Sequence, residues 1–257
     1  MTRRLADSRW VAIAFGAACV IAAIAIVEVL VRTAVINPYI VPPPSDILKA
    51  IPRVIAEENV LHRFSQTAQE MLWAAVLLAV VGIPLGVLLY SSRLLRRAFE
   101  SWVGAFAAAP VVLAYPLFLV TFGRSAMTII AIGFAAGLAP VILTTLDGLV
   151  GTRRVLLDVG TSFRLSSRQK FFKILLPSAL PSVFVGMRLG LIFAMINIVG
   201  VEFLINFGGL GQLINELAER YDLPGTYAAI AFVVLASVLF FDVTARIERH
   251  FGFGPAQ

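Results

Sequence analysis

The sequence has few of the residues that disulfide frameworks, metal centres and catalytic sites require. Cys19 is the single cysteine among 257 residues, which excludes a disulfide framework and a cysteine-ligated metal site. The two histidines, His62 and His250, are far apart in the chain, so no metal cluster is visible. No Ser-His-Asp set or paired carboxylates are visible either, which disfavours an enzyme.

Lysine is also scarce, and its positions exclude a nucleotide-hydrolysing motor. The three lysines, Lys49, Lys170 and Lys173, are followed by Ala, Phe and Ile. A phosphate-binding loop has the pattern G-x-x-x-x-G-K-[ST], in which Ser or Thr follows the lysine. The chain therefore takes its energy from a separate ATPase or does not use ATP.

Charge is sparse too, and apolar residues take its place. Charged residues make up 14% of the chain and hydrophobic residues 60%, with a mean hydropathy of +0.92. Several apolar runs reach roughly 20 residues, the length that spans ~30 Å of hydrocarbon. We therefore expect an all-α integral membrane protein surrounded by lipid. The net charge of +6 comes from basic residues at loop ends, so it indicates membrane topology and not a nucleic-acid partner.

Six spanning helices are predicted, and their order follows the hydropathy. The predicted spans are residues 10–31, 66–90, 99–122, 126–146, 181–203 and 226–243. With this order, 15 of the 21 basic residues fall on one side and six on the other, so both termini are expected in the cytoplasm. The first run is too long for a cleaved signal peptide and is interpreted as a retained helix.

The chain is divided into an N-terminal part, 1–64, and a core, 65–257. The N-terminal part holds the first helix and a long outer segment. In that segment Ser45 or Asp46 is expected to cap a short helix, and Glu28 is expected to reach the membrane interface. Apolar residues at helical spacing make this helix amphipathic and place it along the membrane surface: Ile47, Leu48, Ile51, Val54 and Ile55.

A polar, basic loop at 153–177 separates the fourth and fifth predicted helices. Such a loop cannot lie in hydrocarbon, and its excess of basic residues places it in the cytoplasm. The loop also carries apolar side chains that have to be buried. Burial against a partner protein and burial against the loop's own membrane domain remain equally open. The side chains are those of Phe163, Phe171, Phe172, Ile174 and Leu175.

The sequence Ile-Leu-Leu-Pro at 174–177 resembles the end of the cytoplasmic coupling loop of ABC importer permeases. That family has Glu-Ala-Ala, three residues, Gly, nine residues and then Ile-x-Leu-Pro. The second half matches here residue for residue, whereas Asp-Val-Gly at 158–160 stands in place of Glu-Ala-Ala. Arg164 stands where the family has glycine, so the turn there is either strained or differently shaped. The resemblance assigns ATPase coupling to Asp158, Gly160, Arg164, Leu165, Phe171, Ile174, Leu176 and Pro177.

A second stretch, Pro-Pro-Pro-Ser at 42–45, resembles the branch of these permeases that carries taurine, aliphatic sulfonates, nitrate or thiamine precursors. The resemblance implies the type I ABC importer architecture in a bacterial inner membrane. It implies three partners: a second permease copy, an ABC ATPase in two copies and an extracytoplasmic solute-binding protein. This chain would hold no cofactor, because ATP and Mg²⁺ belong to the ATPase. The loop would sit in a groove of the ATPase, and a hinge at Pro177–Pro181 would pass its motion to the fifth helix.

Prolines interrupt the predicted third helix, and carbonyls freed there are tolerated only against protein or a watery cavity. The related permeases have a Pro-rich segment here beside the translocation pathway, which makes Pro110 and Tyr115 pathway candidates. Tyr115 is equally well explained as a packed aromatic residue. On the predicted fifth helix, Met187 and Asn197 are further candidates.

Glu202 matches a family glutamate at the outer end of the fifth helix. An ionisable residue near a spanning segment is a functional hypothesis by default. Its role is either structural or gating near the outer mouth, or a direct contact with the solute. The Gly-rich turn that follows, 206–211, also resembles the family.

Two functions from other classes compete with an importer permease. An ATP-independent secondary transporter predicts an internal hydropathy repeat and charge pairs within the membrane, and neither is clear in the sequence. A membrane scaffold without transport would not need the Ile-x-Leu-Pro loop. The sequence does not specify the solute.

Overall fold

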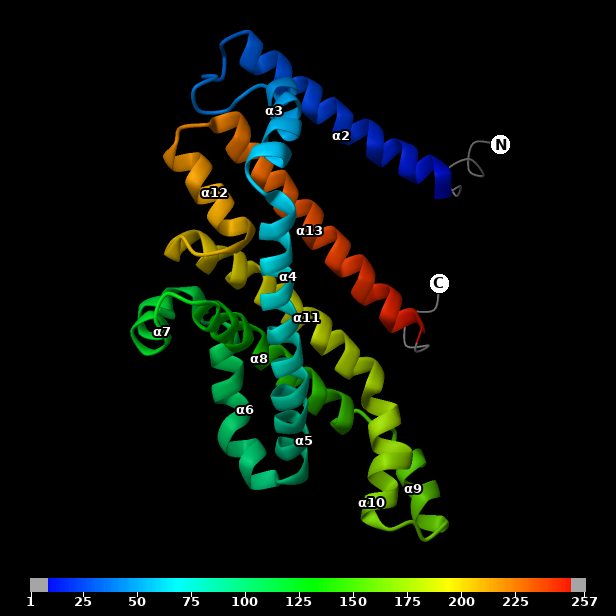
Figure 1. Ribbon diagram of the computed structural model, residues 1–257. Helices are drawn as coiled ribbons and strands as arrows, with labels where there is room; N and C mark the ends of the chain where they lie inside the picture. The colour runs from blue at the N-terminus through cyan, green and yellow to red at the C-terminus, as the bar shows by residue number, and fades with distance from the viewer. Residues whose placement is uncertain (1–8, 251–257) are drawn as a thin grey trace, which may run out of the picture. The chain divides into compact units, whose positions relative to one another are not determined.

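The computed structural model describes residues 9–250, and every regular element among them is a helix (Figure 1). A spanning segment has to satisfy its backbone hydrogen bonds internally, which a helix does. In chain order the elements are α2 (Arg9–Arg32), α3 (Pro44–Glu57), α4 (Val60–Leu77), η1 (Leu78–Gly82), α5 (Ile83–Ser91), α6 (Arg93–Ala107), η2 (Val111–Ala114), α7 (Tyr115–Phe122), α8 (Ala126–Val150), α9 (Arg154–Ser162), α10 (Ser167–Lys170), η3 (Phe171–Leu175), α11 (Leu176–Ile205), α12 (Gly209–Glu219) and α13 (Leu223–His250).

Five helical segments of the described chain are long and apolar enough to span a membrane, or six if one bent pair counts as a span. The five are Ile13–Arg32, Val60–Ser91, Ala126–Val150, Ser167–Ile205 and Leu223–Arg246. The all-α membrane architecture is therefore confirmed. The predicted third helix is the bent pair: α6 and the segment η2–α7 meet at 91°. The bend lies at Pro110. Proline interrupts a helix, because it has no N–H to donate and restricts the backbone of the residue before it.

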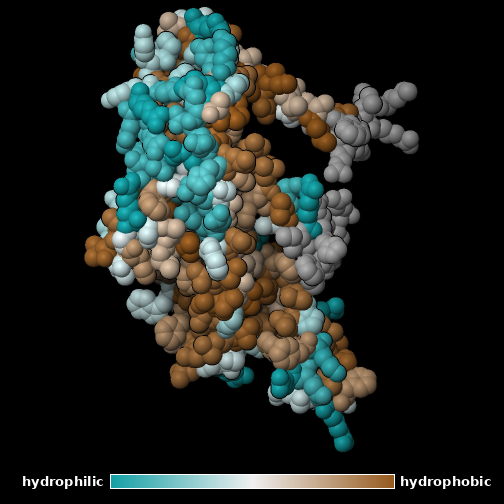
Figure 2. Space-filling model, in the orientation of Figure 1, coloured by the Kyte–Doolittle hydropathy of each residue, from teal (hydrophilic) through white to brown (hydrophobic). Residues whose placement is uncertain are grey.

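The chain divides into two compact units. One contains the residues up to Val60 together with Leu213–Phe232, and the other contains Leu61–Gln212 together with the residues from Val233 on. In the second unit, brown apolar side chains cover the spanning helices and teal polar ones gather around α9 and α10 (Figure 2).

The core of the second unit is the close packing of α8 on α11. A Cβ atom on Gly137 would lie 2.5 Å from the carbonyl oxygen of Gly190, and one on Gly148 would lie 2.6 Å from Cβ of Ser182. Small residues let two membrane helices approach this closely and gain van der Waals contact. The core therefore holds α11 firmly along much of its length.

The elements α10, η3 and α11 form one continuous helical segment of 39 residues, Ser167–Ile205. At 1.5 Å per residue this segment is about 58 Å long. Pro177 and Pro181 lie within it without a break. The π-helical turn η3 precedes Pro177. In this turn the N–H of Leu176 bonds to the carbonyl of Phe171, five residues earlier. The loop therefore continues directly into α11, and the hinge at Pro177–Pro181 stays a prediction.

In the first unit, the N-terminus of α3 is capped from α2. The carboxylate of Glu28 accepts hydrogen bonds from the backbone N–H of Ser45 at 3.0 Å and from its hydroxyl at 2.9 Å. Glu28 also pairs with Arg32. Pro43 occupies the N-cap position and offers no side-chain bond, so the expected cap by Ser45 or Asp46 is wrong. A carboxylate on the neighbouring helix takes that role, because it complements the positive helix end.

Two ion pairs attach α3 to the turn between α12 and α13. Arg53 pairs with Asp222 at 2.5 Å, and Arg220 pairs with Glu58 at 2.6 Å. Asp222 also accepts the N–H of Gly225 at 3.1 Å in the first turn of α13. The hydrogen bond that Arg53 donates to the Asp222 carboxylate raises the pKa of Arg53, because it favours the charged guanidinium.

Candidate functional site

The loop at 153–177 is built from two short helices joined by a left-handed turn. After α9 ends, the N–H of Leu165 bonds to the carbonyl of Gly160 and the N–H of Arg164 bonds to that of Thr161, both at 2.9 Å. These two bonds form a Schellman motif, in which the residue after the cap is left-handed. Arg164 has φ +49°, so it adopts the left-handed conformation that glycine takes most readily, with the strain of a Cβ atom.

The second short helix begins with a capping box. The hydroxyl of Ser166 accepts the N–H of Gln169 at 3.3 Å, and the Gln169 side chain accepts the N–H of Ser166 at 2.9 Å. Both bonds satisfy N–H groups that a helix start leaves open. The pattern Ser-x-x-Gln was a readable signal for this start.

The two halves of the loop's sequence pattern contact each other. A Cβ atom on Gly160 would lie 2.6 Å from Cδ1 of Ile174, so this position admits no larger side chain without a shift. Leu175 is buried in a cluster with Leu149 of α8, and Phe171 packs against the same cluster. Part of the loop's apolar surface therefore packs on its own membrane domain.

The rest of that apolar surface is exposed. Val155, Val159 and Phe163 recur every four residues along α9 and form one face of it, which we call the α9 apolar stripe. Phe163 is 77% exposed and Phe172 is 55% exposed. Some apolar side chains of the loop are thus buried against its own membrane domain, and others remain exposed and available to a partner protein. Of the other assigned residues, Leu165 and Leu176 are half-buried, and Asp158, Arg164 and Pro177 are exposed.

The pathway candidates lie in two places on the second unit. Pro110 is exposed at the bend, and Tyr115 begins α7 half-buried. A Cβ atom on Gly200 would lie 3.7 Å from Val112, which places η2 against α11 one turn beyond Asn197. The Asn197 amide donates to the carbonyl of Phe193 at 2.8 Å, within its own helix. Met187 is half-buried nearer the other end of α11.

Glu202 lies apart from these residues, in a buried polar cluster at the N-terminus of α12. It is 0% exposed. Its carboxylate accepts the Thr67 hydroxyl at 2.7 Å and the Gly211 N–H at 2.7 Å. The Leu210 N–H bonds to the Thr67 hydroxyl oxygen at 2.9 Å, and the Gly209 N–H bonds to Gln66 at 3.1 Å. The first three N–H groups of α12 therefore all find acceptors on α4 or α11.

The glycines of this turn make room for the carboxylate. A Cβ atom on Gly209 would lie 2.1 Å from Glu202, and one on Gly211 would lie 2.2 Å from the Val199 carbonyl. Gly209 also has φ +69°, a conformation that other residues rarely adopt. The Gly-rich turn is thus a capping site for a protein carboxylate.

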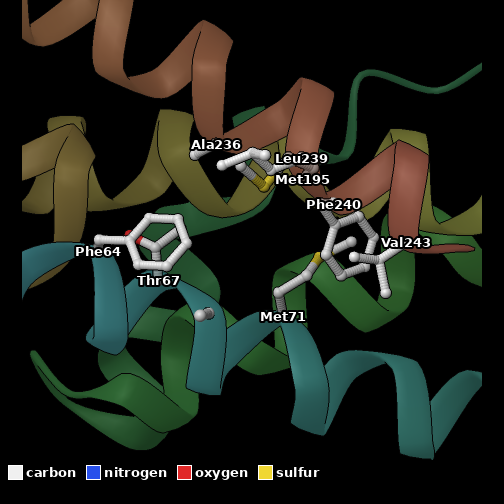
Figure 3. A pocket seen from close by; sticks show the side chains of 9 residues that line it. Phe64, Thr67, Met71, Met195, Ala236, Leu239, Phe240 and Val243 are labelled. Atoms are coloured by element: carbon white, nitrogen blue, oxygen red, sulfur yellow. The ribbon is translucent and has the colours of Figure 1, made fainter. Parts of the chain in front are cut away.

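Next to this cluster, α4, α11 and α13 enclose a hollow of about 190 Å³ (Figure 3). Side chains such as Met71, Met195 and Phe240 point into it. Thr67 is its one polar lining residue, and the Thr67 hydroxyl is bonded to Glu202. The rest of its lining is apolar, so the hollow offers a polar molecule no further hydrogen-bonding group.

Sequence reasoning missed most of the polar cluster. Gln66, Thr67 and Glu70 are not among the site residues that the sequence predicts. Polar side chains on one face of a spanning helix were the available signal. Their acceptor role depends on the turn at 206–211, which is distant in sequence.

The family pattern of the binding-protein-dependent transport system inner membrane component matches residues 62–251. The chain belongs to this family. The match covers the whole of the loop at 153–177, α11 and the polar cluster. It confirms the resemblance that the loop sequence indicated.

Individual relatives agree with the branch indicated by the Pro-Pro-Pro-Ser stretch. The formylaminopyrimidine transport permease protein ThiX of Halalkalibacterium halodurans is 27% identical over 215 residues, which are 83% of this chain and 85% of the relative. The taurine transport system permease protein TauC of Escherichia coli is 23% identical over 209 residues, 79% of this chain and 76% of the relative. The nitrate import permease protein NrtB of Synechocystis sp. is 28% identical over 170 residues, 66% and 62% of the two chains.

The fold is similar to that of a solved transporter. A chain of the MetNI methionine ABC transporter, in an inward-facing conformation, aligns with a TM-score of 0.62 and 20% sequence identity. The alignment covers 74% of this chain and 95% of that chain. This permease thus has the type I ABC importer fold and is a multi-pass membrane protein.

Proposed function

We propose that this chain is the membrane subunit of an ATP-driven importer in a bacterial inner membrane. It passes a small solute that an extracytoplasmic binding protein delivers, and a separate ATPase, holding ATP and Mg²⁺, drives it through the loop at 153–177. Family membership supports the transport role. The observation that carries the coupling is the exposed apolar surface of the loop.

The α9 apolar stripe and Phe172 form the surface that contacts the ATPase. The loop carries six basic residues as well, so its exposed apolar side chains lie among charges and face water in the isolated chain. Burying a phenylalanine stabilises an interface by roughly 2 kcal/mol. Two exposed phenylalanines and two valines therefore favour a protein partner over solvent.

Motion of the ATPase reaches the membrane along a single helix. The motif residues Ile174 and Leu176 lie in the segment Ser167–Ile205, which has no break. A displacement of the loop therefore moves α11 as a rod, and the packing of α8 on α11 carries it into the core of the second unit. Asn197 and the bend at Pro110, beside α11, are the groups that such a movement would rearrange.

The solute class follows from the relatives alone. Those proteins are described as carrying a formylaminopyrimidine, taurine and nitrate, so a small polar solute is proposed here. A second permease copy completes the pathway, and two ATPase copies serve the pair. The bend at Pro110 brings backbone groups to the surface of this chain, where such a pathway would pass.

Co-purification tests the coupling surface. The tagged chain is expressed with its candidate ATPase, and wild type is compared with the double variant Phe163→Ala, Phe172→Ala. The matched control is Phe99→Ala, Phe106→Ala, which removes two exposed phenylalanines from α6. We expect the loop variant to lower the affinity for the ATPase by at least about tenfold and the control to leave it unchanged.

Two outcomes contradict this function. If wild type retains no ATPase, the chain works without one, and the secondary-transporter hypothesis takes its place. If both double variants retain the ATPase equally, the coupling surface lies elsewhere. Thermal unfolding of all three chains in detergent verifies that the loop variant is folded.

A further inference from the structure

Two carboxylic side chains meet in the interior of the second unit. Glu70 on α4 is 4% exposed and Glu202 on α11 is 0% exposed, and the two carboxyl groups are within hydrogen-bonding reach of each other. One oxygen of Glu70, Oε2, is buried and has no hydrogen-bond partner. Thr67 is one helical turn before Glu70, so these two side chains share the face of α4 that contacts Glu202 of α11.

Nearby cations do not compensate this pair. Among the described side chains, no lysine or arginine bonds to either carboxyl. Arg124, which approaches the same turn, donates to the backbone carbonyl of Asn206. Two adjacent negative charges in a buried place repel each other strongly, and neither keeps its full hydration. The pair therefore has to bind one positive charge.

The acceptor pattern identifies which carboxyl stays ionised. Glu202 accepts an O–H from Thr67 and an N–H from Gly211, both at 2.7 Å, and both bonds favour a carboxylate. Glu70 accepts no such hydrogen bonds. Because an ionised carboxylate can only accept, a hydrogen bond between Glu70 and Glu202 requires a proton on Glu70. We propose that Glu70 carries a proton, donates it in a hydrogen bond to Glu202, and so acts as a positioning residue for the carboxylate that caps α12.

A proton fits this place better than a metal ion. Each Glu202 oxygen already accepts a short hydrogen bond from a neutral group, and the described residues offer no third carboxylate, histidine or cysteine here to complete a metal site. A protonated carboxyl adds one donor and displaces nothing. The result is a closed network in which Glu70 from α4 and Glu202 from α11 hold the start of α12 together.

Two variants of Glu70 separate donation from charge. Glu70→Gln keeps the shape and offers an N–H donor without a charge, so amide exchange at Gly209, Leu210 and Gly211 should stay within about twofold of wild type. Glu70→Ala removes the donor, and the same amides should exchange at least about tenfold faster. Hydrogen–deuterium exchange of the purified full chain in nanodiscs measures both. Equal acceleration in the two variants would overturn the proposal, because it would show that Glu70 acts as an anion.

Infrared spectroscopy detects the protonated carboxyl directly. It compares wild type with Glu70→Gln, so it does not depend on whether Glu70→Ala folds. Wild type at neutral pH should show the carbonyl-stretch band of a protonated carboxylic acid that is shielded from exchange, and Glu70→Gln should lack it. The other titratable groups whose side chains the structure describes on these elements are His62 and Arg63 on α4, Arg188 on α11, Glu216 and Glu219 on α12, and Tyr227, Asp242 and Arg246 on α13, and Arg124 lies in the turn before α8. Glu70→Gln leaves all of them in place, so a lost band belongs to the Glu70–Glu202 pair, and the hydrogen bonds that Glu202 accepts assign its proton to Glu70. A band that persists in Glu70→Gln, or thermal stability of wild type that rises with Na⁺ and not in Glu70→Gln, would overturn the proposal.

Discussion

The loop at 153–177 and the polar cluster around Glu202 lie near opposite ends of α10–α11 and are built in opposite ways. The loop is shaped by bonds between residues close in sequence, the Schellman motif at Arg164 and the capping box at Ser166, and it leaves apolar side chains exposed. The cluster is formed by residues that are distant in sequence, and its polar groups are buried and bonded to one another. The loop is left open for a partner, whereas the cluster closes the chain on itself.

The comparison implies that substitutions in the two regions fail in different ways. In the cluster, each lost side chain leaves buried polar groups without partners, so stability falls. In the loop, an exposed apolar side chain contributes little to the isolated chain, and its loss weakens only the interaction with a partner. The predictions that follow are arranged from the largest expected effect on stability to the smallest.

Glu202→Ala should have the largest effect. It leaves the Thr67 hydroxyl and the Gly211 N–H buried without their acceptor, which costs about 3–5 kcal/mol. Thermal unfolding in detergent measures this loss. Glu219→Ala, at the far end of α12, is the control and should change stability by less than about 0.5 kcal/mol. If the two variants unfold alike, the cluster is not a closed structural site.

Gly209→Ala should lower stability by about 2–3 kcal/mol. Its Cβ atom would overlap Glu202, and φ at this position is +69°. Gly104→Ala on α6 is the matched control, since nothing lies within 4 Å of its Cβ position. The control should be unchanged or slightly more stable. A Gly209 variant as stable as the control would mean that the turn adapts and does not need to admit the carboxylate.

Ser166→Ala should cost about 1 kcal/mol, confined to the loop. The variant loses the capping box, so the amides of α10 should exchange faster while the unfolding temperature of the whole chain changes little. Ser167→Ala, one residue further on, lacks this role and serves as the control. A loss of global stability in Ser166→Ala would remove the distinction between the two regions.

Arg164→Gly should give the smallest change and of the opposite sign, a gain of about 0.5–1 kcal/mol. Glycine removes the strain of a left-handed residue at φ +49°. Arg168→Gly, within α10, should instead be destabilising by a similar amount. Chemical denaturation of the three chains in detergent compares them, and a destabilising Arg164→Gly would show that the arginine side chain itself stabilises the loop.

Much of the fold could be predicted from the sequence, because long apolar runs and basic loop ends determine spans. The pattern at 174–177 also indicated the family. Which apolar side chains of the loop are buried and which are exposed could not be predicted. Phe171 and Leu175 are covered by contact with Leu149 of α8, and this contact depends on the tertiary packing and not on the loop sequence. The continuous helix through Pro177 was missed because a proline usually ends a helix. Here the π-helical turn η3 comes just before Pro177, and the helix continues. The contact of Glu202 with Thr67 was missed because the two residues are 135 positions apart in the chain.

Thiol labelling of the α9 apolar stripe tests the central claim most directly. Val159→Cys is placed in a Cys19→Ser background, so that it is the single thiol, and Leu94→Cys in the same background is the exposed control at the start of α6. A water-soluble maleimide is added with and without the ATPase. The account predicts that the ATPase slows labelling of Val159→Cys by at least about tenfold and leaves Leu94→Cys unaffected. Equal labelling of Val159→Cys with and without a bound ATPase would contradict it.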